Sequence, residues 1–319
     1  MSALPPSPTA LPFPGSNRAT APRLVPATSP NRESRDSIGI GKLVEGQMRA
    51  VLEIIKTKKL LNEPPPQPTG DRGIVIAGGG KYLSWAWVNA KWTRQLGVTL
   101  PMQVWHLGEA EMPRKVRHLF TDLDVELVDA FQVRNQHWHR MLKGWSVKQY
   151  AAMRCPWQTV LSLDADAFLF APPEQVLDDP DFIETGAFFC ADVNKCRQSN
   201  WAHFYANVPP PEQEMESGYF AWDRVKAWEG IKMTHWIAEH ADVFDKIIYG
   251  DKSRPELGFG TTNTPFLFAN KPQWMGYGIR HHWKGQPIVD HGMGWKRGEH
   301  AAPNPILPRL FEEWRSLTN

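Results

Sequence analysis

The chain has 319 residues, of which 42% are hydrophobic, and its formal net charge is +2. This composition supports a sizeable core, whereas the balanced charge argues against a surface that follows nucleic-acid phosphates. No apolar run approaches the roughly 20 residues that span a bilayer, and the first residues lack the pattern of a signal peptide. The three cysteines lack zinc-site spacing, so we expect reduced thiols and a cytoplasmic location.

The N-terminal part divides into two segments by composition. Residues 1–37 are rich in Pro, Ser, Thr and Ala, which predicts a disordered or extended tail. Residues 38–61 place apolar side chains at helical spacing, which predicts an amphipathic helix. A proline-rich linker completes the segment 38–68. This helix either packs on the main domain, which is the simpler expectation, or mediates self-association.

Strand and helix signals then alternate through residues 69–305. The expected elements are, in chain order, a strand at 73–77, a helix at 83–96, and strands at 102–107 and 125–128. This alternation predicts an α/β fold, in which a Rossmann-like mixed sheet carries helices on its faces and forms a single domain. A C-terminal helix is expected at 306–319.

The first of these strands runs into the glycines Gly78, Gly79 and Gly80. Glycine lets the backbone approach a ligand closely, so this turn is typical of a nucleotide site. It is not a P-loop, because Lys81 is followed by Tyr82 rather than by Ser or Thr. It also lacks the third glycine of a dinucleotide fingerprint. A plain strand–turn–helix connection is the alternative.

Two acids, Asp164 and Asp166, close another apolar run that predicts a buried strand. Side chains two residues apart on a strand point the same way, about 7 Å apart. A divalent cation such as Mg²⁺ or Mn²⁺ would compensate their charge and bind substrate phosphates. The alternative is a pair of turn-forming or helix-capping acids. In a parallel sheet, the glycine turn and the acid pair lie at the same edge.

Lys148 lies in the helical stretch that leads toward the acid pair. From there its side chain points toward the Asp-x-Asp strand, where it would meet the phosphate or sugar of a bound nucleotide. A solvated lysine on a helix surface is the alternative.

The motifs occur along the chain in the order Gly73–Gly80, Leu100–Trp105, Val147–Ala151, Leu163–Asp166, Glu216–Tyr219, Gly250–Lys252 and His291–Lys296. This series resembles a GT-A glycosyltransferase over residues 72–297. It is most similar to the fungal-type α-mannosyltransferases that extend outer mannan chains, and more distantly to the glycogenin-like retaining transferases. The resemblance implies a GT-A catalytic domain, a GDP- or UDP-linked sugar donor, Mn²⁺ or Mg²⁺, a glycan or other hydroxyl acceptor, and retention of configuration.

The resemblance also implies roles for individual residues. Asp164 and Asp166 would hold the metal, and His291 would complete its coordination. The donor would be bound by Gly78, Gly79, Tyr82, Lys148, Asp164 and Lys296. Glu216 and Asp251 would be the catalytic acids beside the donor sugar. The alternative for Glu216 is an exposed loop acid, and the alternative for Asp251 is a turn residue flanked by glycine. The pair His281-His282 is the alternative to His291 as a source of the histidine metal ligand.

The resulting interpretation is a metal-dependent, retaining hexosyltransferase with mannose as the favoured sugar. One alternative is a GT-A transferase that uses a UDP-sugar on a non-glycan acceptor, including nucleic acid, although the balanced charge argues against nucleic acid. Another is a nucleotidyltransferase on a similar sheet, and a third is a glycan-binding protein without catalysis.

Overall fold

The computed structural model describes residues 46, 64–195, 208, 211, 213–245, 248, 251–292, 302 and 304–318. The tail expected at 1–37 lies outside the described residues, and so does the helix expected at 38–61 apart from residue 46. Self-association through that helix therefore stays a prediction.

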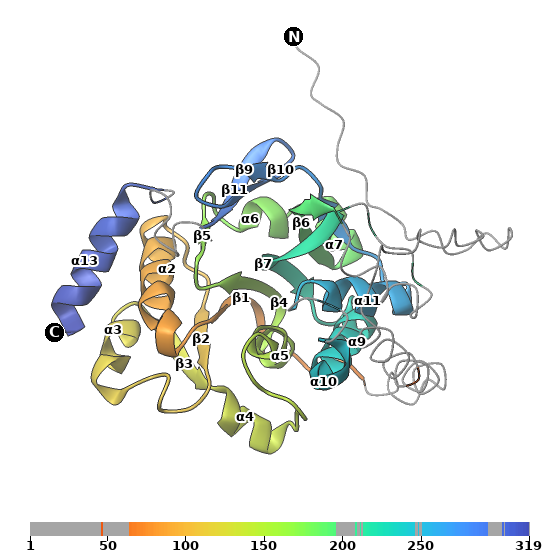
Figure 1. Ribbon diagram of the computed structural model, residues 1–319, viewed down its shortest axis with the longest axis horizontal. Helices are drawn as coiled ribbons and strands as arrows, with labels where there is room; N and C mark the ends of the chain where they lie inside the picture. The colour runs from red at the N-terminus through yellow and green to blue at the C-terminus, as the bar shows by residue number, and fades with distance from the viewer. Residues whose placement is uncertain are drawn as a thin grey trace, which may run out of the picture.

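Within these ranges, the domain is built on a seven-stranded sheet with the order β3-β2-β1-β4-β7-β6-β8 (Figure 1). Its strands are β1 (Gly70–Ala77), β2 (Met102–His106), β3 (Val125–Asp129), β4 (Trp157–Asp164), β6 (Ala187–Lys195), β7 (Gln213–Asp223) and β8 (Leu267–Ala269). Strands β3, β2, β1 and β4 run parallel, and β7 is antiparallel to both of its neighbours. The expected Rossmann-like mixed sheet is confirmed.

The two faces of this sheet carry separate parts of the core, because successive side chains of a strand point to opposite faces. Ile74 and Ile76 of β1 pack in one cluster, and Val75 packs in the other. The first cluster includes side chains of α2 (Leu83–Gln95), α3 (Arg117–Thr121), α6 (Glu174–Leu177), α7 (Pro180–Thr185) and α13 (Ile306–Thr318). The second includes side chains of α4 (Ala130–Gln136), α5 (Ser146–Arg154), α9 (Trp228–Glu239) and α11 (Ser253–Thr262).

The C-terminal helix α13 packs along α2 at one side of the molecule, where the two helices lie side by side (Figure 1). Aromatic rings form this contact. The ring centroids of Trp87 and Trp314 are 5.5 Å apart, and those of Trp85 and Phe311 are 4.7 Å apart. None of the helices in the described part of the chain has both the length and the apolar character needed to cross a bilayer.

A smaller sheet of four strands, in the order β5-β11-β10-β9, completes the described part of the fold. Its strands are β5 (Ala167–Leu169), β9 (Gln273–Trp274), β10 (Ile279–Trp283) and β11 (Gln286–His291). Strand β5 follows β4 after a two-residue turn, and it pairs with β11 so that Ala167 lies opposite His291. This pairing joins two segments that are far apart in the sequence.

Three buried rings form a cluster between α5, which carries Tyr150, and α9, which carries His235. The ring centroids of His139 and His235 are 4.6 Å apart, and Tyr150 lies 5.2 Å from His139. Burial, assisted by the positive charge of Arg134, lowers the pKa of His139 to about 4. Burial also holds the pKa of His235 well below its usual value. Both imidazoles are therefore neutral at pH 7.

We expect this cluster to make the fold sensitive to acid. Between pH 6.5 and pH 4 the unfolded chain takes up protons that folded His139 excludes, so the free energy of unfolding falls as the pH falls. The contribution of His139 is on the order of 3 kcal/mol at pH 4 relative to pH 7. Urea unfolding at several pH values measures it.

The variant His139→Gln should lose less stability on acidification than the wild type does. The matched control is His118→Gln, because His118 is exposed. An equally steep loss of stability in His139→Gln and in the wild type would contradict the assignment.

Candidate metal and donor site

The pairing of β5 with β11 brings the three predicted metal ligands together. Ligand atoms of Asp164, Asp166 and His291 all lie within 4.8 Å of one another. His291 Nε2 is 3.5 Å from Asp166 Oδ1 and 3.8 Å from Asp164 Oδ2. Metal–ligand bonds of about 2.1 Å place neighbouring ligand atoms roughly 3 to 3.5 Å apart. The separations of the three groups are close to that range, and a donor set of two carboxylates and an imidazole suits a divalent cation such as Mn²⁺ or Mg²⁺.

The turn that carries the two acids is held by Asn89 of α2, which is fully buried. Its Nδ2 group donates to the backbone carbonyls of Asp164 at 3.0 Å, Ala165 at 3.2 Å and Ala167 at 2.8 Å. On the other side, the backbone N–H of Gly292 donates to the carbonyl of Asp166 at 2.9 Å. The acid pair is thus fixed from both the large sheet's helix layer and the small sheet.

Glu216 of β7 lies behind His291 and is only 2% exposed. Its Oε1 is 2.9 Å from His291 Nδ1, and its Oε2 accepts a hydrogen bond from the backbone N–H of Gly218 at 2.8 Å. His281 Nε2 lies 3.5 Å from the same Oε2. The predicted catalytic acid is therefore buried between two histidines, and the exposed-loop alternative for Glu216 is wrong. The competing histidine His281 lies on the far side of Glu216 from His291.

The charges of neighbouring side chains decide the protonation states of Glu216 and His291. Burial alone would raise the pKa of Glu216, but His291 and His281 hold that pKa well below its usual range. Burial alone would lower the pKa of His291, but Glu216 and Asp166 raise it well above its usual range. The site therefore attracts positive charge at the position that His291 Nε2 faces.

Lys148 of α5 is 2% exposed and bridges two carboxylates. Its Nζ lies 2.5 Å from Asp164 Oδ1 and 2.8 Å from Asp251 Oδ2, and it donates to the carbonyl of Ser217 at 2.9 Å. Burial opposes the charge of Lys148, but the two carboxylates raise its pKa above the usual value. The solvated-lysine alternative is therefore wrong. Ser217 Oγ also donates to Asp251 Oδ1 at 3.0 Å, so Asp251 is a buried acid, and it lies in a turn.

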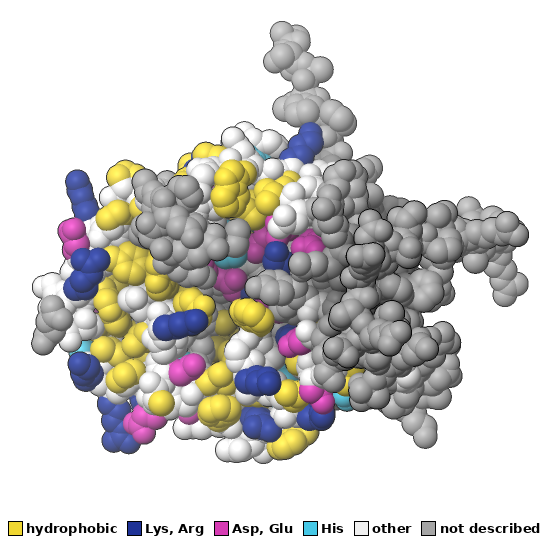
Figure 2. All heavy atoms as spheres, viewed as in Figure 1, with side chains coloured by type: hydrophobic (Ala, Val, Ile, Leu, Met, Phe, Trp, Pro, Cys, Tyr) yellow, Lys and Arg dark blue, Asp and Glu magenta, His cyan; other side chains and the backbone are white. Residues whose placement is uncertain are grey.

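The described residues of this region carry more negative than positive charge. Asp164, Asp166, Glu216 and Asp251 contact the ammonium group of Lys148 and the imidazoles of His281 and His291, and Lys81 also lines the pocket. Burial raises the pKa of Asp164 to about 6 despite the opposing effect of the lysine ammonium. On the face drawn in Figure 2, acidic side chains gather near the centre, whereas charges of both signs are mixed elsewhere. This excess of carboxylates suits a divalent cation.

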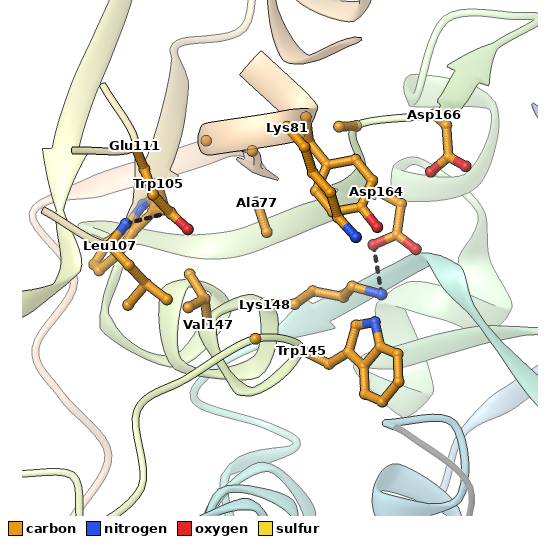
Figure 3. Close-up of a pocket in the computed structure, with 15 residues that line it drawn as sticks. Ala77, Lys81, Trp105, Leu107, Glu111, Trp145, Val147, Lys148, Asp164 and Asp166 are labelled. Carbon is orange, nitrogen blue, oxygen red and sulfur yellow. Dashed lines mark hydrogen bonds and ion pairs between the residues drawn. The ribbon is translucent and has the colours of Figure 1, made fainter. Parts of the chain in front are cut away.

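A pocket opens beside these side chains at the carboxyl ends of β1, β2 and β4 (Figure 3). The predicted site residues that line it are Gly78, Gly79, Tyr82, Lys148, Asp164 and Asp166. Asp251 lies behind this lining and contacts it through Lys148. Lys296 is outside the described residues. The exposed ring of Trp145, which is 55% accessible, also lines the pocket beside Lys148.

The sequence did not predict Glu111 as a site residue. Glu111 lies at the end of the pocket away from Asp164 and Asp166, next to Trp105 and Leu107 (Figure 3). Its Oε2 accepts a hydrogen bond from the backbone N–H of Leu107 at 2.8 Å, and no described Lys or Arg pairs with it. The available signal was its position, because it follows the second strand at the same sheet edge as the glycine turn.

The glycine turn approaches Glu111 directly. The backbone N–H of Gly80 donates to the carbonyl of Glu111 at 2.8 Å. A Cβ atom at Gly79 would lie 2.8 Å from Glu111 Cβ, closer than real side chains approach. Gly80 has φ of +54°, which glycine adopts without strain. The glycines thus allow the turn and the acidic loop to form one wall of the pocket.

Part of the chain is similar in sequence to known proteins. A family model described as "Mannosyltransferase putative" matches residues 71–208. The alpha-1,2-mannosyltransferase MNN2 of Saccharomyces cerevisiae is 27% identical over 124 residues, which are 38% of this chain and 21% of that protein. The chain therefore spans about a fifth of the length of this curated relative.

Two solved structures are similar to this chain. An active-site mutant of LgtC has a TM-score of 0.52 and 17% sequence identity, over 77% of this chain and 96% of that chain. The galactosyltransferase LgtC in complex with donor and acceptor sugar analogues has a TM-score of 0.46 and 17% identity, over 62% of this chain and 73% of that chain. The chain thus has the GT-A fold, and its residues 71–208 are similar to a mannosyltransferase family.

Proposed function

We propose that this protein transfers a hexose, with mannose favoured, from a nucleoside-diphosphate sugar to a hydroxyl acceptor with retention of configuration. The observation that carries this proposal is the cluster of Asp164, Asp166 and His291, whose acids line a pocket beside the glycine turn. The mannosyltransferase-like segment 71–208 supports the choice of sugar.

Asp164, Asp166 and His291 would hold Mn²⁺ or Mg²⁺. When bound, such a cation stabilises the negative charge that develops on the leaving diphosphate. Lys148 holds a positive charge at the same wall of the pocket, where its ammonium faces Asp164. It would add a hydrogen-bond donor for the diphosphate or for a sugar hydroxyl.

Asp251 is the carboxylate that we assign to the sugar side of the reaction, where it acts through its charge from behind the pocket lining. Its Oδ1 accepts from Ser217, and its Oδ2 faces Lys148, so the group is fixed and charged. Burial alone would raise its pKa, but Lys148, Arg254 and the hydroxyl of Ser217 together lower that pKa below the usual value. A fixed carboxylate stabilises the positive charge that the sugar carbon acquires during glycosyl transfer.

Two reaction routes retain the configuration of the transferred sugar. One is a double displacement through a covalent intermediate. The other is attack on the same face of the sugar, in which the leaving phosphate accepts the proton of the acceptor hydroxyl. The second route requires no dedicated base.

The chemistry of Glu111 favours guanine over uracil at the far end of the pocket. An ionised carboxylate only accepts hydrogen bonds. Guanine presents two adjacent N–H donors, at N1 and N2, whereas uracil presents one donor between two carbonyl oxygens that a carboxylate repels. Glu111 keeps lone pairs for such donors after accepting from Leu107. We therefore assign a GDP-linked donor, and a UDP-sugar with a non-glycan acceptor is the second candidate.

Incubation with Mn²⁺ and a panel of UDP- and GDP-sugars tests the function. We expect slow hydrolysis of one GDP-hexose, detected as released GDP, and no such release by Asp166→Ala, because that variant lacks a metal ligand. Asp166→Ala should also lose the rise in melting temperature that Mn²⁺ causes in the wild type.

The matched control is Asp122→Ala, which changes an exposed acid outside the pocket. No turnover and no Mn²⁺-dependent thermal shift with any donor would overturn the transferase proposal. Pyrophosphate release from a nucleoside triphosphate and a sugar phosphate would favour the nucleotidyltransferase alternative, and metal-independent sugar binding without turnover would favour the glycan-binding alternative.

The preference for guanine over uracil is tested by titrating GDP and UDP into the protein with Mn²⁺ in a calorimeter. We expect GDP to bind at least about 10-fold more tightly than UDP, which corresponds to 1.4 kcal/mol. Glu111→Gln should weaken the binding of GDP by about 10-fold and change the binding of UDP much less, because the side-chain amide cannot accept hydrogen bonds from both guanine donors. Glu109→Gln, in the same loop but exposed, is the control. Equal losses for both nucleotides in Glu111→Gln would refute the role of Glu111.

A further inference from the structure

We propose that Glu216 is a positioning residue, which selects the tautomer of His291 and aims its Nε2 at the cation site between Asp164 and Asp166. This inference rests on the proposed function, because it takes those residues as metal ligands. It gives Glu216 a part different from the contact with the donor sugar that the sequence motif implies.

Both oxygens of Glu216 are already engaged in the protein. Oε1 lies 2.9 Å from His291 Nδ1, and Oε2 accepts from the backbone N–H of Gly218 and faces His281. With 2% of its surface exposed, Glu216 lies outside the lining of the pocket. It therefore acts on a cation bound between Asp164 and Asp166 through His291 and not by direct contact.

The hydrogen-bond pattern determines which nitrogen of His291 carries the proton. A carboxylate only accepts, so the nitrogen beside Glu216 Oε1, which is Nδ1, must be the donor. In the neutral ring the lone pair then resides on Nε2, which is 3.5 Å from Asp166 Oδ1 and 3.8 Å from Asp164 Oδ2. This is the arrangement in which a carboxylate orients a metal-binding histidine and increases its basicity.

The backbone around Glu216 leaves room for this contact only because residue 218 is glycine. A Cβ atom at Gly218 would lie 2.8 Å from His291 Nδ1 and 2.9 Å from Glu216 Oε2. The imidazole ring thus packs directly on the β7 backbone. On the other side of Glu216, the ring of His281 is 1% exposed and limits movement of the carboxylate. The ring of His291 is held in one orientation before any ligand binds.

The affinity for Mn²⁺, measured by electron paramagnetic resonance of the free ion, tests this role. We expect Glu216→Gln to bind Mn²⁺ roughly 10- to 100-fold more weakly than the wild type. Glu256→Gln is the matched control, because Glu256 is equally buried and accepts a hydrogen bond from the backbone of Met215 on the same strand. That control should lose stability and keep its affinity for Mn²⁺ within about 3-fold.

A double-mutant cycle with His291→Ala separates positioning from a general structural effect. If Glu216 acts through His291, adding Glu216→Gln to His291→Ala weakens Mn²⁺ binding no further. An equal loss in both backgrounds, or wild-type affinity in Glu216→Gln, would overturn the positioning role and leave the metal site in place. A wild type that binds no Mn²⁺ would overturn both the metal site and the inference.

The wild-type protein offers a measurement that needs no variant. With Zn²⁺ as a diamagnetic probe, nitrogen-15 spectra of the histidines should show His291 protonated at Nδ1 and unprotonated at Nε2. The opposite tautomer would overturn the inference even if every Glu216 variant failed to fold.

Discussion

The candidate site depends on one pairing of strands. β5 begins directly after the Asp-x-Asp turn, and its pairing with β11 sets Ala167 opposite His291. A shift of this register by one residue would turn the imidazole to the other face of the small sheet. Asn89 and Gly292 hold the same turn through its backbone carbonyls, so the two acids and the histidine are supported from separate elements.

The second constraint is electrostatic. Four buried or partly buried carboxylates would repel one another if they stood alone in a region of low dielectric constant. Lys148 compensates Asp164 and Asp251, and the histidines compensate Glu216. Each acid is therefore fixed in direction by a partner, which is the kind of preorganisation that glycosyl transfer requires. The remaining negative charge lies where the cation is proposed.

The pocket extends from this charged end to a chemically different one. Near Asp164 it presents the amino groups of Lys81 and Lys148, two carboxylates and an exposed tryptophan ring. Near Glu111 it presents one carboxylate beside apolar side chains. A nucleotide sugar has the same polarity along its length, with a charged diphosphate and sugar at one end and a flat base at the other. The glycine turn forms the wall that runs from one end of the pocket to the other. Because its glycines have no side chains, a ligand can approach the backbone of the turn.

Local patterns in the sequence were enough to predict the α/β fold, the glycine turn, the Asp-x-Asp pair and Lys148 near that pair. These features depend on side-chain alternation and on neighbours within a few residues. The partners of these residues could not be derived locally. Only the tertiary structure decided that Glu216 faces His291, that Asp251 shares Lys148 with Asp164, and that Glu111 joins the pocket. Each of these contacts joins separate strands or loops, and long-range pairing of strands leaves no periodic signal at the residues it brings together.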